Sequence, residues 1–291
     1  MAIEFYKLSG SGNDFLALAE PESVPAPEEI RAWCRRGVSL GADGLIVIRP
    51  GSEIDMAYWN ADGHPADLCL NGTRCAARLA FDLGWRTSAA ADPNASLAIR
   101  TGAGTWTARS LPGARIALDL PFPSDPPVAR RLEALGEIHE AWSITVGVPH
   151  LVLLWPESLA SAPVETLGPP LRRHPELGPA GANVDFVRFP AEGNRHRMEI
   201  RTFERGVEGE TLSCGTGVLA SAAVGLALGL AELPLLVATQ SGFELEVRGD
   251  GTEGAPPKRW SLVGDARIVA RGELWPEAGA APSAPPWGNL Q

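Results

Sequence analysis

The chain has 291 residues, which is enough for two domains with ordinary hydrophobic cores. Its 45% apolar and 21% charged residues are typical of a globular protein, and its formal net charge of −10 offers no basic surface for nucleic acid or anionic lipid. The N-terminus lacks the features of a signal peptide, and the uncharged run 212–231 is too rich in glycine for a membrane span. We therefore expect a cytoplasmic protein that binds neither nucleic acid nor membrane.

The four cysteines form no CxxC pair, and the five histidines form no HxxxH or HExxH motif. This spacing predicts no metal site, and in a reducing compartment the thiols are expected to be free. Cys34 is expected to pack under an amphipathic helix, and Cys75 to face the core.

In the first half of the chain, strand and turn patterns surround one small-residue helix. The predicted elements are a strand, a glycine turn and an apolar strand in 3–19, a helix in 27–36, two strands in 41–63, a helix in 72–83, a hairpin in 96–110 and a strand in 114–123. The proline-rich segment 121–127 is predicted to be a stiff linker.

The second half repeats this plan from about Trp142, with strands in 143–155 and 181–206, a helix after Cys214 and a hairpin in 235–251. The two helical segments match in spacing: a glycine lies three residues, an alanine eight and a glycine fifteen after Cys69 and again after Cys214. We infer an internal duplication, with domains at 1–121 and 122–272. The Ala- and Pro-rich tail 273–291 is predicted to be disordered.

Each half places a cysteine at the start of its small-residue helix. The helix after Cys214 carries no charge, so it must be buried in the sheet, and its first N–H groups lack partners within the helix. Gly215, Thr216 and Gly217 beside Cys214 therefore predict an anion site with a thiol at its edge, although an inert core cysteine would give the same local pattern. The repetition at Cys69, followed by Asn71 and Gly72, favours the anion site.

A two-fold relation between the halves would direct both thiols at one ligand, and the helix N-termini are expected to lower their pKa toward neutrality. Two acid–base groups on opposite faces of one carbon are what a racemase or epimerase needs. The chain has only Lys7 and Lys258, so a pyridoxal phosphate Schiff base is difficult to build. We expect no cofactor, and a substrate carboxylate held on the two helix N-termini instead.

Six segments in order resemble the diaminopimelate epimerase family, over about residues 5–269: KxxGxGNDF from Lys7, GADGLI from Gly41, NADG from Asn60, CxNGxRC from Cys69, ERG from Glu204 and ETLSCGTG from Glu210. The resemblance implies cofactor-independent interconversion of L,L- and meso-diaminopimelate in lysine and peptidoglycan precursor synthesis. It also implies an α/β (α+β) fold of two pseudo-symmetric domains, each a curved, barrel-like mixed sheet around a central helix, with the active site in the cleft between them. Diaminopimelate is then the small-molecule partner, and a homodimer is left open.

The resemblance also assigns roles. Cys69 and Cys214 correspond to the proton-transfer pair, and His150 and Glu204 to auxiliary acid–base groups. The substrate-binding set comprises Asn13, Asn60, Leu70, Asn71, Gly72, Asn183, Glu204, Arg205, Gly215 and Thr216. Within this set, Asn71 and the backbone at 70, 72, 215 and 216 correspond to the carboxylate cradle, and Arg205 corresponds to the partner of the distal carboxylate.

Three residues depart from the family pattern. Leu70 replaces a usual glycine, so its side chain must point away from the ligand. Val148 replaces a usual asparagine, and Glu208 is an extra residue. These departures keep open a cofactor-independent racemase of another amino acid on the same fold. A non-catalytic amino-acid-binding protein or a thiol-redox protein is the third reading, but a redox protein would favour a CxxC pair.

Overall fold

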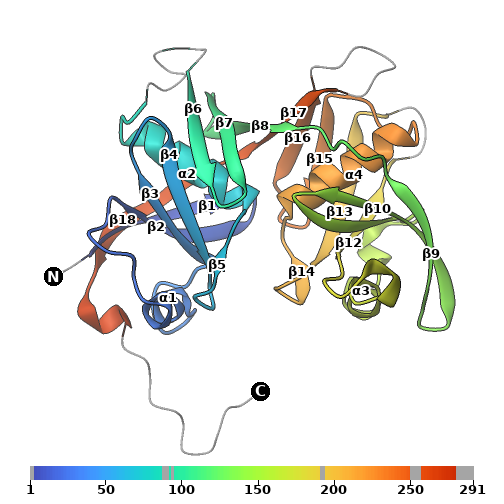
Figure 1. The fold of residues 1–291 in the computed structure, drawn as a ribbon, viewed down its shortest axis with the longest axis horizontal. Helices are drawn as coiled ribbons and strands as arrows, with labels where there is room; N and C mark the ends of the chain where they lie inside the picture. The colour runs from blue at the N-terminus through green and yellow to red at the C-terminus, as the bar shows by residue number, and fades with distance from the viewer. Residues whose placement is uncertain (1–2, 87–91, 93–94, 191–193, 250–256, 280–291) are drawn as a thin grey trace, which may run out of the picture.

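The computed structural model describes residues 3–86, 92, 95–190, 194–249 and 257–279. Figure 1 shows two halves side by side, each with strands around one central helix, and β8 between them. The first half contains β1 (Ile3–Gly10), β2 (Asn13–Ala19), α1 (Pro27–Cys34), β3 (Gly44–Arg49), β4 (Ile54–Asn60), β5 (Pro65–Ala66), α2 (Leu70–Asp82), β6 (Ser96–Thr101), β7 (Gly104–Leu111) and β8 (Arg115–Pro121).

The second half repeats this order and adds short 3-10 turns. It contains β9 (Val128–Ala134), β10 (Glu137–Val146), β11 (Val148–Leu154), η1 (Leu159–Ser161), α3 (Val164–Arg172), η2 (Pro175–Leu177), β12 (Asn183–Arg188), β13 (Arg197–Glu204), β14 (Gly209–Thr211), α4 (Gly215–Ala227), β15 (Leu235–Thr239), β16 (Glu244–Gly249) and β17 (Arg259–Asp265). The chain then continues into β18 (Arg267–Leu274) and η3 (Pro276–Gly279).

Strand pairing relates the two halves. The parallel pair β2–β3 corresponds to β11–β12, and the parallel pair β4–β6 corresponds to β13–β15. Antiparallel pairing of β8 with β17 joins the halves into one hydrogen-bonded network. The mixed α+β fold of two related halves is therefore confirmed.

The core of each half forms layers around its central helix. Residues of α2 and α4 share one buried cluster that runs through both halves. On the outer side of the sheets, Ile30 and Trp33 of α1 pack on β2 and β3, and Leu167 and Leu171 of α3 pack on β12 and β13. Burying one such side chain contributes about 1.5–3 kcal/mol, so the outer helices fix the strands that carry the site.

The cysteines at 34 and 75 lie where they were expected. Cys34 is buried in the cluster under α1, and Cys75 is buried in the main core beside Gly10. The helix predicted at 72–83 begins two residues earlier, at Leu70, because Cys69 provides its extended N-cap.

Two predicted boundaries were wrong at the C-terminal end. β18 lies within the predicted second domain, yet it pairs with β1 of the first half, so the chain returns across the junction after Asp265. The predicted disordered tail was also placed too early: 273–274 complete β18, and Pro276–Gly279 forms a 3-10 turn whose Ala278 packs beside the α1 cluster. Residues 280–291 lie outside the described residues.

In the part of the chain that the structure describes, no helix has the length and apolar character needed to cross a membrane.

Candidate active site

Both cysteines of the repeat are helix N-cap residues with extended backbones. Cys69 has φ −140° and ψ 103°, and its sulfur accepts a hydrogen bond from the Gly72 backbone N–H at 3.4 Å. Cys214 has φ −112° and ψ 107°, and its sulfur lies 3.4 Å from the Thr216 hydroxyl. The extended N-cap turns each chain into its helix, so each thiol lies beside the free N–H groups of the first turn.

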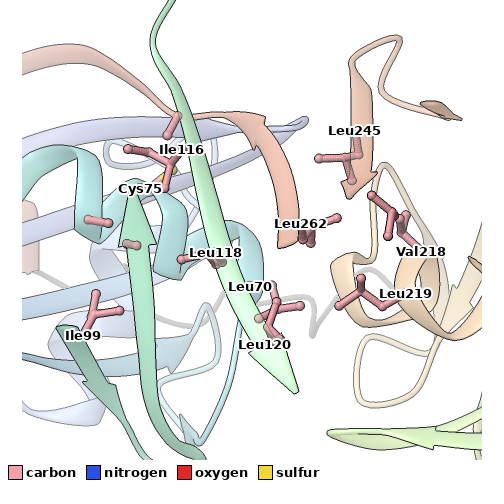
Figure 2. Packing of buried hydrophobic residues seen from close by; sticks show 14 of the residues in the cluster. Leu70, Cys75, Ile99, Ile116, Leu118, Leu120, Val218, Leu219, Leu245 and Leu262 are labelled. Carbon is pink, nitrogen blue, oxygen red and sulfur yellow. The ribbon is translucent and has the colours of Figure 1, made fainter. Parts of the chain in front are cut away.

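The first turns of α2 and α4 are in direct contact. A Cβ added to Gly215 would lie 2.9 Å from Leu70 Cβ, so glycine is required where the two N-termini meet. Leu70 is 3% exposed, and Figure 2 shows it between α2 and the side of α4 that carries Leu219, near Leu262. The side chain that departs from the family pattern therefore packs in the junction between the halves.

The Asn71 side chain ties the N-terminus of α2 to the loop before Cys214. Its amide nitrogen donates to Asn13 Oδ1 at 2.7 Å and to the Ser213 carbonyl at 3.0 Å, and its Oδ1 accepts from Arg74 at 2.7 Å. Because both amide hydrogens are engaged, the Asn71 side chain has no donor left for a ligand.

A chain of polar groups leads from Cys214 into the second half. His150 Nε2 lies 3.0 Å from the Thr216 hydroxyl, and His150 Nδ1 lies 2.7 Å from Asp185 Oδ2. Both His150 and Asp185 are fully buried, and Thr202 donates to the other Asp185 oxygen at 2.7 Å. With the carboxylate accepting from Nδ1–H, Nε2 is the unprotonated ring nitrogen, so it can receive a proton that leaves Cys214 through Thr216.

Asn183 connects this chain to the loop after β13. Its Oδ1 accepts from the Arg205 backbone N–H at 2.7 Å, and its Nδ2 lies 3.4 Å from His150 Nε2. The Arg205 side chain is half-exposed and has no hydrogen-bond or ion-pair partner among the described residues. Its guanidinium is therefore available to an anion.

The extra residue Glu208 closes this same loop. It has φ 59°, and its carboxylate accepts from the Gly206 backbone at 3.1 Å and from Arg172 Nε at 2.8 Å. Glu208 thus fastens the Arg205 turn to the end of α3.

In the first half, Asn13 is fixed by a polar network, whereas Asn60 is free. Asn13 Nδ2 donates to Asp43 at 2.9 Å while its Oδ1 accepts from Asn71. The ammonium of Lys7 lies 2.6 Å from Asp14, so this lysine is engaged in an ion pair. Asn60 is exposed at the end of β4, and no described residue bonds its side chain.

The expected lowering of the thiol pKa is contradicted. Burial raises the pKa of Cys69 to about 11, with the Gly72 N–H opposing this effect and the Glu204 charge adding to it. The pKa of Cys214 is raised well above its ordinary value, first by burial and then by the charges of Glu204 and Asp185. Desolvation thus outweighs the donors of the helix N-termini.

Glu204 acts electrostatically on both thiols. Burial raises the pKa of its carboxyl, so the neutral form is favoured more than in water. A neutral Glu204 does not oppose a thiolate at either cysteine, whereas a charged one does. Its protonation is therefore coupled to that of the two thiols.

Two buried residues were missed by sequence reasoning. Asp185 is an acid inside the apolar strand NVDFVR, and a charge in a buried strand is itself a signal that a partner is present. Arg74 lies within the CxNGxRC segment and was assigned no role. Among the described residues, no group of three or more His, Cys, Asp or Glu side chains could hold a metal ion.

Comparison with known proteins gives one consistent result. The diaminopimelate epimerase family model matches residues 5–107 and 142–268. A diaminopimelate epimerase from Gemmatimonas aurantiaca is 37% identical over 94% of this chain and 99% of the relative, and one from Aquifex aeolicus is 35% identical over 94% and 98%.

Solved structures share the fold at low sequence identity. A probable proline racemase from Agrobacterium radiobacter has a TM-score of 0.68 and 17% identity, covering 95% of each chain. A hydroxyproline epimerase from Agrobacterium vitis has a TM-score of 0.65 and 15% identity, covering 96% of this chain and 94% of that one.

Proposed function

Because the chain belongs to the diaminopimelate epimerase family, we propose that it interconverts L,L- and meso-diaminopimelate by moving one α-proton between Cys69 and Cys214. The observation that carries this proposal is the contact between two helix N-termini that are each capped by a cysteine. In each direction one sulfur, as thiolate, removes the α-proton from one face, and the other, as thiol, supplies a proton to the opposite face.

We assign the reacting carboxylate to the first turns of α2 and α4. The backbone N–H groups of Leu70, Asn71, Gly215 and Thr216 belong to these turns and have no partner within their own helices. Each helix N-terminus carries roughly half a positive charge. These fixed dipoles stabilise the negative charge that develops as the α-proton leaves, which is the chemistry a cofactor would otherwise supply.

Because burial raises the pKa of both thiols, a thiolate needs a nearby proton acceptor. We assign His150, backed by Asp185, to Cys214 through the Thr216 hydroxyl. Glu204, whose charge reaches both sulfurs, is the auxiliary group shared by the two halves. Four free cysteines suit a reducing compartment, and we propose the cytoplasm.

The second amino-acid end of the substrate is assigned to the Arg205 loop and the exposed Asn60. Arg205 has a free guanidinium, which can bind the distal carboxylate through two parallel hydrogen bonds. Asn183 holds the backbone of this loop, and Asn13 holds Asn71.

One observation favours a racemase of another amino acid as the second candidate function. Val148 begins β11 where Asn13 begins β2, and it offers no side-chain hydrogen bond to a distal substrate end. Losing one polar contact costs on the order of 1 kcal/mol in recognition.

A proton NMR assay in D2O with L,L-diaminopimelate tests reaction and substrate together. The α-hydrogen signal is expected to disappear while the meso isomer forms. Arg205→Met is expected to lower kcat/KM for diaminopimelate by about tenfold or more, because the two-point contact is lost. Arg197→Met is the matched control, since Arg197 begins β13, the strand that leads into the Arg205 loop, and pairs with Glu244. Faster exchange of proline, lysine or glutamate than of diaminopimelate would move the assignment to the second candidate.

A further inference from the structure

Arg74 is a charged side chain enclosed in the core of the first half. It is 0% exposed, and one nitrogen, Nη2, donates to Asn71 Oδ1 and Ser11 Oγ, both at 2.7 Å. Its Nε and Nη1 have no hydrogen-bond partner among the described residues. A Cβ added to Gly264 would lie 2.8 Å from Arg74 Nε, so the guanidinium lies directly against the backbone of β17.

The two acceptors of Arg74 both lie at the junction between the halves. Ser11 is fully buried and has φ 52°, which is unfavourable for a residue other than glycine, and both its N–H and its hydroxyl donate to Asp265. Asn71 spans the junction to the Ser213 carbonyl, one residue before Cys214. By occupying Asn71 Oδ1, Arg74 directs the amide hydrogens of Asn71 toward Asn13 and Ser213.

The other half of the molecule shows that the fold does not need a charge at this position. Arg74 is the fifth residue of α2, and the fifth residue of α4 is Leu219, which is also fully buried. Burying a charge with an incomplete set of hydrogen bonds is costly, whereas a leucine at this position stabilises the core. Only the Cys69 half buries a charge at this position, so we look for the function of Arg74 at Cys69.

We propose that Arg74 is a positioning residue for the Cys69 half of the site: it orients Asn71 across the junction and supplies the positive charge that stabilises the Cys69 thiolate. The inference rests on the proposed function in taking Cys69 as a reacting group. The charge of Arg74 lowers the pKa of Cys69, opposing the larger effect of burial and that of Glu204. Cys214 caps the other helix, where His150 is linked to it through the Thr216 hydroxyl.

The test compares Arg74→Met with Arg78→Met. Arg78 lies one turn further along α2, where it donates to the Ala266 carbonyl, so it is a matched arginine outside the site. Iodoacetamide alkylation of each cysteine is followed by peptide mass spectrometry from pH 7 to 10. In Arg74→Met, the alkylation rate of Cys69 at pH 8 is expected to fall by about tenfold, equivalent to about one pKa unit. The alkylation rate of Cys214 is expected to change by less than about twofold, because Arg74 lies on α2 whereas Cys214 caps α4.

Arg74→Lys separates charge from geometry and retains a cation if Arg74→Met does not fold. The lysine variant is expected to keep the Cys69 alkylation profile, because the positive charge remains. Its kcat/KM is expected to fall by about tenfold, because an ammonium cannot reproduce the planar contact with Asn71 and Ser11. Wild-type turnover in folded Arg74→Lys overturns the orienting role.

An unchanged Cys69 profile in folded Arg74→Met, or an equal loss at both cysteines, overturns the electrostatic role. Alkylation requires no substrate, so this readout stays valid if wild-type protein does not turn over diaminopimelate. Absence of diaminopimelate turnover by the wild-type protein would contradict the proposed function and not the electrostatic role of Arg74.

Discussion

The two cysteine sites have the same backbone frame but different supporting side chains. Each thiol caps a central helix that follows corresponding strands. Beneath α4, strand register places His150, Asp185 and Thr202, which form one hydrogen-bonded set. At the corresponding strand positions beneath α2 are Phe15, Ile46 and Tyr58, and the rings of Phe15 and Tyr58 meet edge to face at 6.0 Å.

This difference separates two requirements of a two-base mechanism. In the proposed mechanism the sulfurs must lie on opposite faces of one carbon, which requires matched helices and strands. Thiolate formation requires only that each thiol has a neighbour that accepts its proton or stabilises its charge, and we assign different ones to the two halves: a histidine–aspartate pair to Cys214 and the buried Arg74 to Cys69. Geometry is therefore duplicated, while electrostatics is specific to each half.

Removing either sulfur is expected to have the largest effect. Cys69→Ala and Cys214→Ala should each lower epimerisation by roughly 10²- to 10⁴-fold, because one face then lacks its acid or base. Each variant is expected to keep some α-hydrogen exchange from one epimer only, and the two variants should favour opposite epimers. Deuterium incorporation from L,L- and from meso-diaminopimelate measures this. Cys34→Ala, in the separate α1 cluster, is the control. Full turnover by Cys69→Ala would exclude the two-thiol mechanism.

Removing the support of one sulfur is expected to have a smaller, one-sided effect. In Asp185→Asn, the new amide can donate to His150 Nδ1, which places the histidine proton on Nε2 and removes the acceptor for Thr216. We expect exchange at the Cys214 face to slow by about 10- to 100-fold, and exchange at the Cys69 face to change far less. Deuterium exchange from each epimer measures the asymmetry.

The matched control for this variant is Asp119→Asn, because Asp119 is a strand carboxylate of β8 that pairs with Arg109 instead of a histidine. Equal slowing of exchange from both epimers in Asp185→Asn would mean that the histidine–aspartate pair serves the whole site. The contrast between the halves would then be structural only.

The two central helices and most hairpins could be predicted from the sequence because they depend on local patterns. Glycine, alanine and cysteine spacing located both helices, the first with its start two residues late, and Pro–Gly or Gly-rich turns located most hairpins. The course of β18 could not be predicted in this way, because its alternating pattern fits any sheet edge and the choice of β1 is a tertiary one. α3 was missed for the opposite reason, since Pro169 and Pro170 argue locally against the helix that contains them.

The supports of the thiols were harder to predict than the thiols themselves. His150 was named through the family resemblance, but its pairing with Asp185 depends on the parallel register of β11 and β12. In the sequence Arg74 resembles an ordinary exposed helix charge, because its burial depends on the strands that pack around α2. The thiol pKa was predicted in the wrong direction because the helix N-terminus is visible in the sequence, whereas the depth of burial is not.

The smallest expected effect concerns stability at alkaline pH, and it tests whether burial governs both thiols alike. Burial raises the pKa of Cys69 from 9.0 to about 11, and that of Cys214 well above 9.0. Between these values the unfolded chain loses the thiol proton while the folded chain keeps it, so the free energy of unfolding falls as pH rises from about 9 toward 11, by about 1.4 kcal/mol per pH unit for each thiol. Urea unfolding from pH 8 to 10.5 should therefore give a shallower decline in Cys69→Ala and in Cys214→Ala than in wild type, by the same amount in each. A shallower decline in Cys214→Ala alone would mean that the Gly72 N–H and the Arg74 charge offset burial at Cys69, and that its thiolate forms closer to neutral pH than that of Cys214.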